Sequence, residues 1–298
     1  MKRRNFLFAG GLVTGTALTQ MLAAQSQPAF PSRNPDGKKP DLFNRNRPAA
    51  PGTTGTSTVM GEMVMISPKL NGYVARPKEG TGPFPSVIVL MEAFGLNRNI
   101  KSVCDLYAKY GYVAIAPDLY HGDSYSYDKV SDAIAKLKTL KDETVITEVG
   151  ETLDYLVKRN DVRPAAIGTI GFCMGGRYAF LMSAAYSDRI KASVAFYGGG
   201  IASNPDPLGR ASLLDRVPQI KGPVMLIYSA EDEYINAEEH ARITQALSQA
   251  RKRYNLAVIP NTQHGFMNDQ RSTYNAAAAL EAWDMAFGFF KKHVKGAT

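Results

Sequence analysis

The sequence has few of the residues and motifs that many classes of function require. It holds two cysteines, four histidines and one tryptophan among 298 residues. A His-Glu-x-x-His pair, a phosphate-binding loop and a Gly-x-Gly-x-x-Gly turn are all missing, so nothing in it requires a metal, a nucleotide or another cofactor. Cys104 has the setting of a buried helical face and Cys173 lies in a glycine-bounded turn, which predicts two unpaired thiols rather than a disulfide.

A concentrated basic surface is lacking as well. The formal net charge is +8, but only 21% of the residues are charged, and the Lys and Arg residues are scattered among acidic ones. Part of the basic excess falls in the first fifty residues, which leaves the remainder closer to neutral. We therefore expect no nucleic-acid partner.

The chain also lacks an apolar run long enough for a stable membrane span. Near its start, Lys2, Arg3 and Arg4 precede an uncharged stretch rich in Gly and Ala that runs from Phe8 to about Ala24. This pattern is typical of a secretory signal, and paired arginines before Phe-Leu indicate the twin-arginine route rather than an ordinary signal. We expect residues 1–24 to be a signal peptide that the twin-arginine export machinery recognises, and the protein to be periplasmic or secreted.

Two further segments follow this predicted signal peptide. Residues 25–60 are rich in Pro, Asn, Gly, Ser and Thr and have few large apolar residues, which predicts a flexible linker. In residues 61–298, apolar runs with β-branched residues alternate with amphipathic stretches of helical length. That alternation predicts one α/β domain, a mostly parallel sheet with helices on both faces. We expect an antiparallel opening pair at 63–66 and 72–75, strands at 85–91, 112–116, 166–170, 192–196, 224–228 and 253–259, and helices near 98–110, twice within 126–159, after 173, and at 274–292.

The central chemical signal is Gly171-x-Cys173-x-Gly175, placed between a buried strand and a helix. A sharp turn with small residues on both sides exposes a nucleophile at a helix N-terminus, and this turn is usually written with Ser. Here the position holds Cys173. A helix N-terminus lowers the pKa of a thiol, which favours the reactive thiolate.

A nucleophile of this kind needs a base, and His264 follows the last predicted strand, where a base can reach back over the sheet edge. His240 and His293 lie in helical stretches and are expected at the surface. His121 also follows a strand and is a candidate to line the pocket.

The acid that orients the base must lie between Cys173 and His264 at another strand end. Asp232 meets that condition, with Glu231 and Glu233 as the competing choices. The three side chains then meet at the carboxyl edge of the sheet, where open α/β sheets place their sites.

A further acid, Glu92, ends the predicted strand 85–91. A charge there is costly unless it is used or paired, so Glu92 is either functional or part of a structural salt bridge. The loop that follows is also where hydrolases of this kind find an oxyanion donor. We expect the N–H groups of Ala93 and Met174 to form the oxyanion hole.

Taken together, the motifs resemble the dienelactone hydrolase (carboxymethylenebutenolidase) family, an α/β-hydrolase family, over roughly residues 61–295. The resemblance rests on five motifs in the family's order: Glu92-x-x-Gly95-Leu96, Ala116-Pro117-Asp118-Leu119-Tyr120, Gly171-Phe172-Cys173-Met174-Gly175-Gly176, Asp232, and His264-Gly265-Phe266. It implies the α/β-hydrolase fold and a triad of Cys173, His264 and Asp232. It also suggests that Glu92 contacts and activates the thiol, which is held protonated at rest.

The chain departs from the family pattern in its substrate-binding arginines. Gly122 stands where the best-known members have one, and the nearest candidate for the second is Arg271, at a different spacing after the histidine. The tentative substrate-binding residues are therefore Arg271, Arg177, His121 and Tyr120.

The expected function is hydrolysis of small lactones or activated esters. The alternatives are a thiol acyltransferase or peptidase that uses the same triad, and a hydrolase homologue that only binds a ligand.

Overall fold

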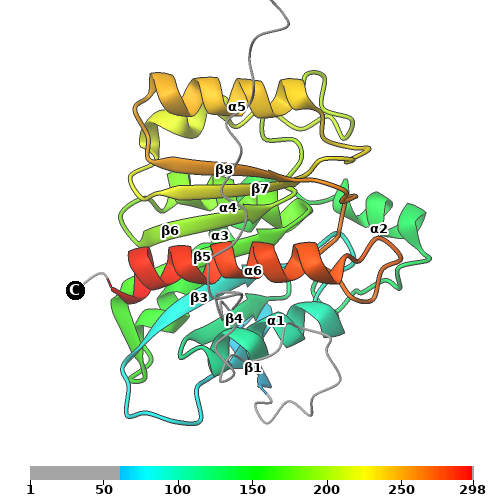
Figure 1. Ribbon diagram of the computed structural model, residues 1–298. Coiled ribbons are helices and arrows are strands. Elements are labelled where there is room, and N and C mark those ends of the chain that lie inside the picture. Colours follow the sequence, from blue (N-terminus) through cyan, green and yellow to red (C-terminus); the bar gives the residue numbers. More distant parts are fainter. Residues whose placement is uncertain (1–60, 297–298) are drawn as a thin grey trace, which may run out of the picture. The chain divides into compact units, whose positions relative to one another are not determined.

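The structure, a computed structural model, describes residues 61–296. Over those residues it forms an eight-stranded sheet in the order β1-β2-β4-β3-β5-β6-β7-β8 (Figure 1). Strand β2 is antiparallel to both neighbours, and every pair from β4 to β8 is parallel. The strands are β1 (Glu62–Ser67), β2 (Leu70–Ala75), β3 (Phe84–Leu90), β4 (Val113–Pro117), β5 (Val162–Phe172), β6 (Ile190–Phe196), β7 (Val224–Ser229) and β8 (Tyr254–Ile259).

Helices cover both faces of this sheet, as a parallel sheet requires. In Figure 1, α1 and α6 lie in front of the sheet, with α3 and α4 behind it. The front pair is joined by the rings of Tyr110 and Phe287, stacked 3.8 Å apart, and the rear pair by the Tyr186 hydroxyl, which donates to the Ile146 carbonyl at 2.7 Å. The helices are α1 (Arg98–Lys109), α2 (Val130–Leu137), α3 (Asp142–Val157), α4 (Met174–Ala185), α5 (Ala237–Gln249) and α6 (Ala276–Phe290), with short helical turns at Leu214–Gln219 and Lys291–Lys295.

This arrangement is the α/β-hydrolase architecture that the sequence predicts, including the antiparallel opening pair. Strand β5 begins at Val162, four residues before the predicted start at 166. The prediction started too late because two exposed residues interrupt the apolar pattern in the first part of the strand. The expectation of a surface His240 is wrong: the ring packs on Tyr228 with centroids 4.1 Å apart, and its Nε2 is buried. Cys104 and Cys173 are both free thiols, as predicted.

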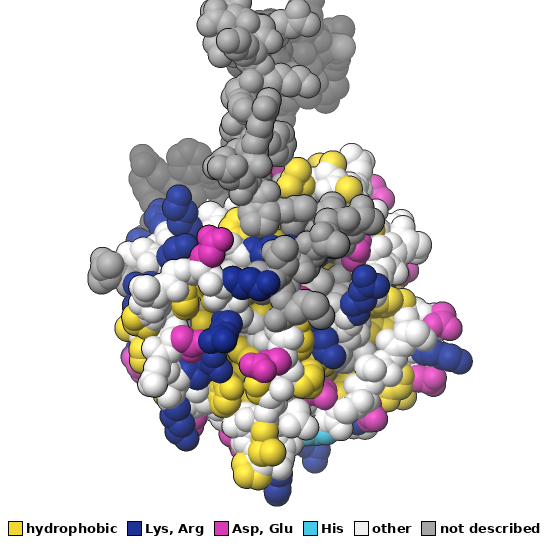
Figure 2. Space-filling view, turned by 90° about the horizontal axis from the view of Figure 1, so that it is seen from below, with side chains coloured by type: hydrophobic (Ala, Val, Ile, Leu, Met, Phe, Trp, Pro, Cys, Tyr) yellow, Lys and Arg dark blue, Asp and Glu magenta, His cyan; other side chains and the backbone are white. Residues whose placement is uncertain are grey.

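The predicted signal peptide and linker, residues 1–60, lie outside the described residues. Within residues 61–296, no helix has both the length and the apolar character needed to cross a membrane. On the face shown in Figure 2, acidic side chains lie among the basic ones. Elsewhere, exposed charges also pair, as Lys221 and Asp188 do.

The junction of β5 and α4 is packed too tightly for any side chain at its glycines. A Cβ at Gly171 would lie 1.9 Å from the Gly175 carbonyl oxygen, and one at Gly175 would lie 2.1 Å from the Leu90 carbonyl oxygen. The backbones of β3, β5 and α4 therefore meet in contact, which fixes where Cys173 stands.

We predict that Gly171→Ala destabilises the protein by about 3 kcal/mol or more, because backbone atoms must move to admit the methyl group. The matched control is Gly288→Ala in α6, where a Cβ meets nothing within 4 Å. That change should stabilise the helix by up to ~1 kcal/mol. Denaturant unfolding of both variants checks this, and equal midpoints would contradict the tight junction.

Candidate active site

Cys173 stands at the first turn of α4 in a backbone conformation that side chains rarely adopt, with φ 54° and ψ −116°. Its N–H donates to the Phe196 carbonyl at 3.0 Å, and its carbonyl accepts from the N–H of Gly176, also at 3.0 Å. A strained residue held by its neighbours in this way is what a nucleophile turn requires. In this backbone conformation the Cys173 side chain lines the pocket.

His264 and Asp232 reach the same edge of the sheet from the loops that follow β8 and β7. The His264 Nδ1 lies 2.9 Å from the Asp232 Oδ2, and the Asp232 side chain has no exposed surface. Asp232 also accepts from the N–H of Tyr234 at 3.0 Å. The neighbouring acids Glu231 and Glu233 are exposed, so the structure pairs Asp232, and neither competitor, with the imidazole.

Two aromatic rings hold the imidazole in place. Tyr197 and Tyr234 each present an edge-on contact to His264, with centroid distances of 5.0 and 5.1 Å. Sequence reasoning did not single out either tyrosine, because they come from separate loops with no shared motif. Their contacts leave the imidazole little freedom to turn away from Asp232 and Cys173.

The thiol and the imidazole perturb each other strongly. Burial alone would raise the pKa of Cys173, but the charge and hydrogen bond of His264 outweigh it, helped by the Met174 N–H, so the pKa is lowered. Burial opposes the charged form of His264 as well, yet Cys173 and Asp232 raise its pKa to about 10. The charged forms of the two groups, a thiolate and an imidazolium, therefore favour each other.

Glu92 is buried close enough to this pair for its charge to act on Cys173, but among the described residues it forms no hydrogen bond with the thiol. Its Oε2 accepts from the Asn268 amide at 2.8 Å, and its Oε1 has no hydrogen-bond partner among the described residues. Burial raises the pKa of Glu92, opposed by the charge of Arg271 and the Asn268 hydrogen bond. The charge of Glu92 raises the pKa of Cys173 while His264 lowers it, so the role that the resemblance suggests for Glu92, holding the thiol protonated, stays a prediction.

Asn268 connects Glu92 to a tyrosine that sequence reasoning missed. The Asn268 amide also donates to the Tyr127 hydroxyl at 2.7 Å, and that hydroxyl accepts from the Asn97 amide at 2.9 Å. Asn268 follows the His264-Gly265-Phe266 motif by two residues, which is the one signal that could have marked it. The network fixes the carboxyl of Glu92 at the floor of the site.

A pocket of about 280 Å³ opens over Cys173 and His264. Ala93 and Met174, the two predicted oxyanion donors, both line it, and so does Arg271. The Arg271 guanidinium lies 5.7 Å from the ring centroid of Phe94. Within residues 61–296, no group of three or more His, Cys, Asp or Glu side chains is arranged to hold a metal ion.

The other three tentative substrate-binding residues do not line the pocket. Arg177 is fully buried and donates to the carboxylate of Asp142 at 2.7 and 2.9 Å, so it does not form the surface pair that its helix position suggests. His121 is exposed and bonds Glu148 at 2.8 Å. Tyr120 is buried, with its hydroxyl 3.8 Å from the Met174 sulfur.

Comparison with known proteins identifies the family of this chain. The model of the "Dienelactone hydrolase family" matches residues 70–294. The chain belongs to the dienelactone hydrolase family. A Yersinia pestis protein named "Putative carboxymethylenebutenolidase" is 34% identical over 229 residues, which cover 76% of this chain and 84% of the relative.

A second relative and a solved structure belong to the same group of hydrolases. A Bradyrhizobium protein named "Probable 2-oxo-3-(5-oxofuran-2-ylidene)propanoate lactonase" is 32% identical over 228 residues, 75% of this chain and 90% of the relative. The crystal structure of a "Putative Dienelactone Hydrolase" from Klebsiella pneumoniae superposes with a TM-score of 0.72 at 28% identity, covering 79% of this chain and 99% of that one. This member of the dienelactone hydrolase family is therefore a carboxymethylenebutenolidase-like hydrolase.

We predict that Cys173 alkylation by iodoacetamide stays fast below the ordinary pKa of a thiol and slows sharply in His264→Ala. Without the imidazole, burial raises the pKa of the thiol. Each unit by which that pKa rises lowers the thiolate fraction about tenfold at neutral pH. The rate is measured from pH 5 to pH 10 by mass spectrometry. Cys173→Ala serves as the blank for labelling of Cys104, and superimposable profiles of wild type and His264→Ala would refute the ion pair.

Proposed function

We propose that this protein is an exported hydrolase of small lactones or activated esters, with Cys173, His264 and Asp232 as its catalytic triad. The observation that carries the proposal is the buried imidazole of His264, which is hydrogen-bonded to Asp232 and lines the same pocket as Cys173, close enough for each group to shift the pKa of the other. A nucleophile, a base and an orienting acid in this relation are sufficient for acyl transfer through a covalent intermediate.

The reaction follows from these contacts. The Cys173 thiolate attacks the carbonyl carbon, and the N–H groups of Ala93 and Met174 stabilise the negative charge on the carbonyl oxygen. The ester C–O bond then breaks, and the imidazolium of His264 gives its proton to the departing alkoxide. Water, deprotonated by the neutral His264, attacks the thioester and releases the acid, which restores the thiolate and the imidazolium.

Glu92 and Arg271 complete the proposed site. A carboxyl beside the thiol raises the pKa of Cys173 when it is ionised, so Glu92 tunes the nucleophile through charge rather than through contact. Arg271 is the one tentative substrate-binding residue that lines the pocket, and we assign it to a substrate carboxylate or carbonyl at the rim. A pocket of about 280 Å³ suits a small acyl group better than a peptide, which favours the hydrolase over the peptidase alternative.

The proposal predicts that Cys173→Ala abolishes turnover of an activated aryl ester and of a small lactone. Removing the triad nucleophile costs on the order of a millionfold in kcat. Circular dichroism and the unfolding midpoint should stay near those of the wild type. Turnover at the wild-type rate in a folded Cys173→Ala enzyme would rule out the triad.

Export is the second part of the proposal and rests on the sequence of residues 1–24. Changing Arg3 and Arg4 to Lys, or deleting residues 1–24, should leave the protein in the cytoplasm because the twin-arginine signal is lost. Cell fractionation with an immunoblot measures the distribution. The control changes Lys38 and Lys39 to Arg, outside the signal, and unchanged export of the Arg3 and Arg4 variant would contradict the assignment.

A further inference from the structure

One wall of the pocket is built by a single face of α2. Its four pocket-lining residues are apolar and follow the i, i+3, i+4, i+7 spacing that places side chains on one side of a helix: Val130, Ala133, Ile134 and Leu137. Ala133 and Leu137 are buried, whereas Val130 is 45% exposed. The exposed apolar residue therefore stands at the open end of an apolar wall.

A second wall of the same pocket is the loop between β6 and the helical turn at Leu214–Gln219. It contributes Pro207 and Leu208 to the pocket, together with Ser203 and Arg210. Those two polar side chains do not remain free for a ligand, because both donate to the carboxylate of Asp206, at 3.0 and 2.9 Å. The carboxylate of Asp206 is only 2% exposed, so the polar groups of this wall satisfy one another.

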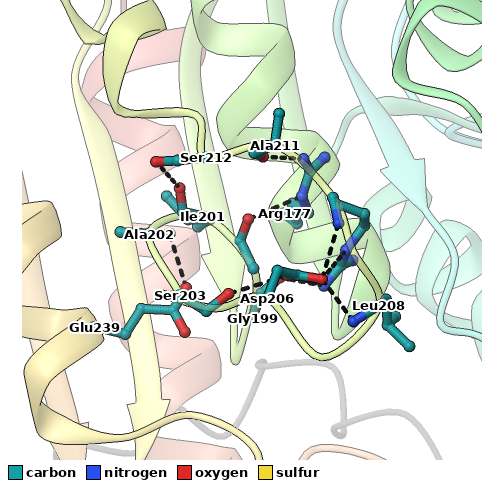
Figure 3. A network of polar contacts seen from close by, with 12 residues as sticks. Arg177, Gly199, Ile201, Ala202, Ser203, Asp206, Leu208, Ala211, Ser212 and Glu239 are labelled. Atoms are coloured by element: carbon teal, nitrogen blue, oxygen red, sulfur yellow. Dashed lines mark hydrogen bonds and ion pairs between the residues drawn. The ribbon is translucent and has the colours of Figure 1, made fainter.

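Buried charges from two helices hold this loop in place, as Figure 3 shows. Arg177 of α4 donates to the carbonyls of Gly200 and Ala211, at 3.0 and 2.9 Å. Glu239 of α5 accepts from the Ala202 N–H at 2.9 Å. The loop is anchored from both sides, so its apolar residues form a fixed surface in the same pocket as α2.

From these two walls we infer that the enzyme selects esters or lactones that carry a neutral, apolar arm, which inserts between α2 and Leu208. This inference rests on the proposed hydrolase function and adds the class of substrate. The other arginine of the pocket, Arg271, lies over the Phe94 ring and against Gly265, next to His264, and its charge acts on Glu92. It therefore belongs to the end of the pocket near the thiol rather than to this apolar cleft. A charged group at the far end of the arm would be desolvated without a partner.

We therefore expect kcat/KM to rise as the arm becomes longer, until the arm fills the cleft. Burial of one methylene group is worth ~0.8 kcal/mol, which corresponds to about a fourfold rise in kcat/KM for each added methylene. The test uses the full chain with p-nitrophenyl alkanoates from acetate to octanoate, and with S-alkyl thioacetates of the same lengths. Together the two series place the arm on either side of the scissile bond.

Three variants separate the cleft from general effects. Ile134→Ala should reduce the rise in log kcat/KM for each added methylene to about half of the wild-type value. Ala133→Leu should move the arm length with the highest kcat/KM to shorter arms, because the larger side chain fills part of the cleft. Ile146→Ala is the matched control, another half-buried helical isoleucine that does not line the pocket. It should leave the whole length series unchanged.

The outcomes separate this inference from the function on which it rests. A rise with length in one series that Ile134→Ala weakens supports it. If the wild type hydrolyses acetate esters but shows no rise in either series, or accepts a carboxylate-ended arm as well as a neutral one of equal length, the apolar arm is wrong and the hydrolase stands. If it hydrolyses no ester or thioester at all, both proposals fall.

Discussion

The hydrogen bond between Asp232 and His264 is the contact on which the rest of the site depends. It is fully buried on the Asp232 side, spans 2.9 Å, and uses the ring nitrogen that faces away from Cys173. Because the carboxylate fixes the tautomer and the orientation of the ring, the other nitrogen is presented to the thiol. Without it, the pKa of the buried imidazole would fall, and the positive charge that lowers the pKa of the buried thiol would be weakened.

The fold supports that contact by bringing three strand ends to one edge. Cys173 follows β5, Asp232 follows β7 and His264 follows β8, and the parallel pairing of β5 through β8 aligns those ends. The strained turn at Cys173 is tolerated because β3, β5 and α4 meet there with no room for side chains. The packing of the sheet therefore also sets the geometry of the candidate site.

The pocket departs from the family's carboxylate-binding pattern in a consistent direction. Gly122 replaces one arginine, Arg177 is committed to Asp142, and Arg210 is committed to Asp206. The cationic groups that remain near the pocket are thus mostly neutralised by internal partners. What faces the substrate from α2 and the loop after β6 is apolar surface, which is the physical basis for expecting a different substrate arm.

The sequence by itself determined the fold class, because runs of β-branched residues and amphipathic stretches alternate along the chain, and it marked Cys173, Asp232 and His264 through local motifs at strand ends. It also marked Glu92 and Arg271 as candidates, and the resemblance added the expectation of a thiol held protonated by Glu92. Only the tertiary structure decided that Glu92 bonds Asn268 and that Arg177 is buried. Those outcomes depend on residues far apart in the chain, whose partners no local pattern of spacing records, since hydrogen bonds and burial are set by packing across elements.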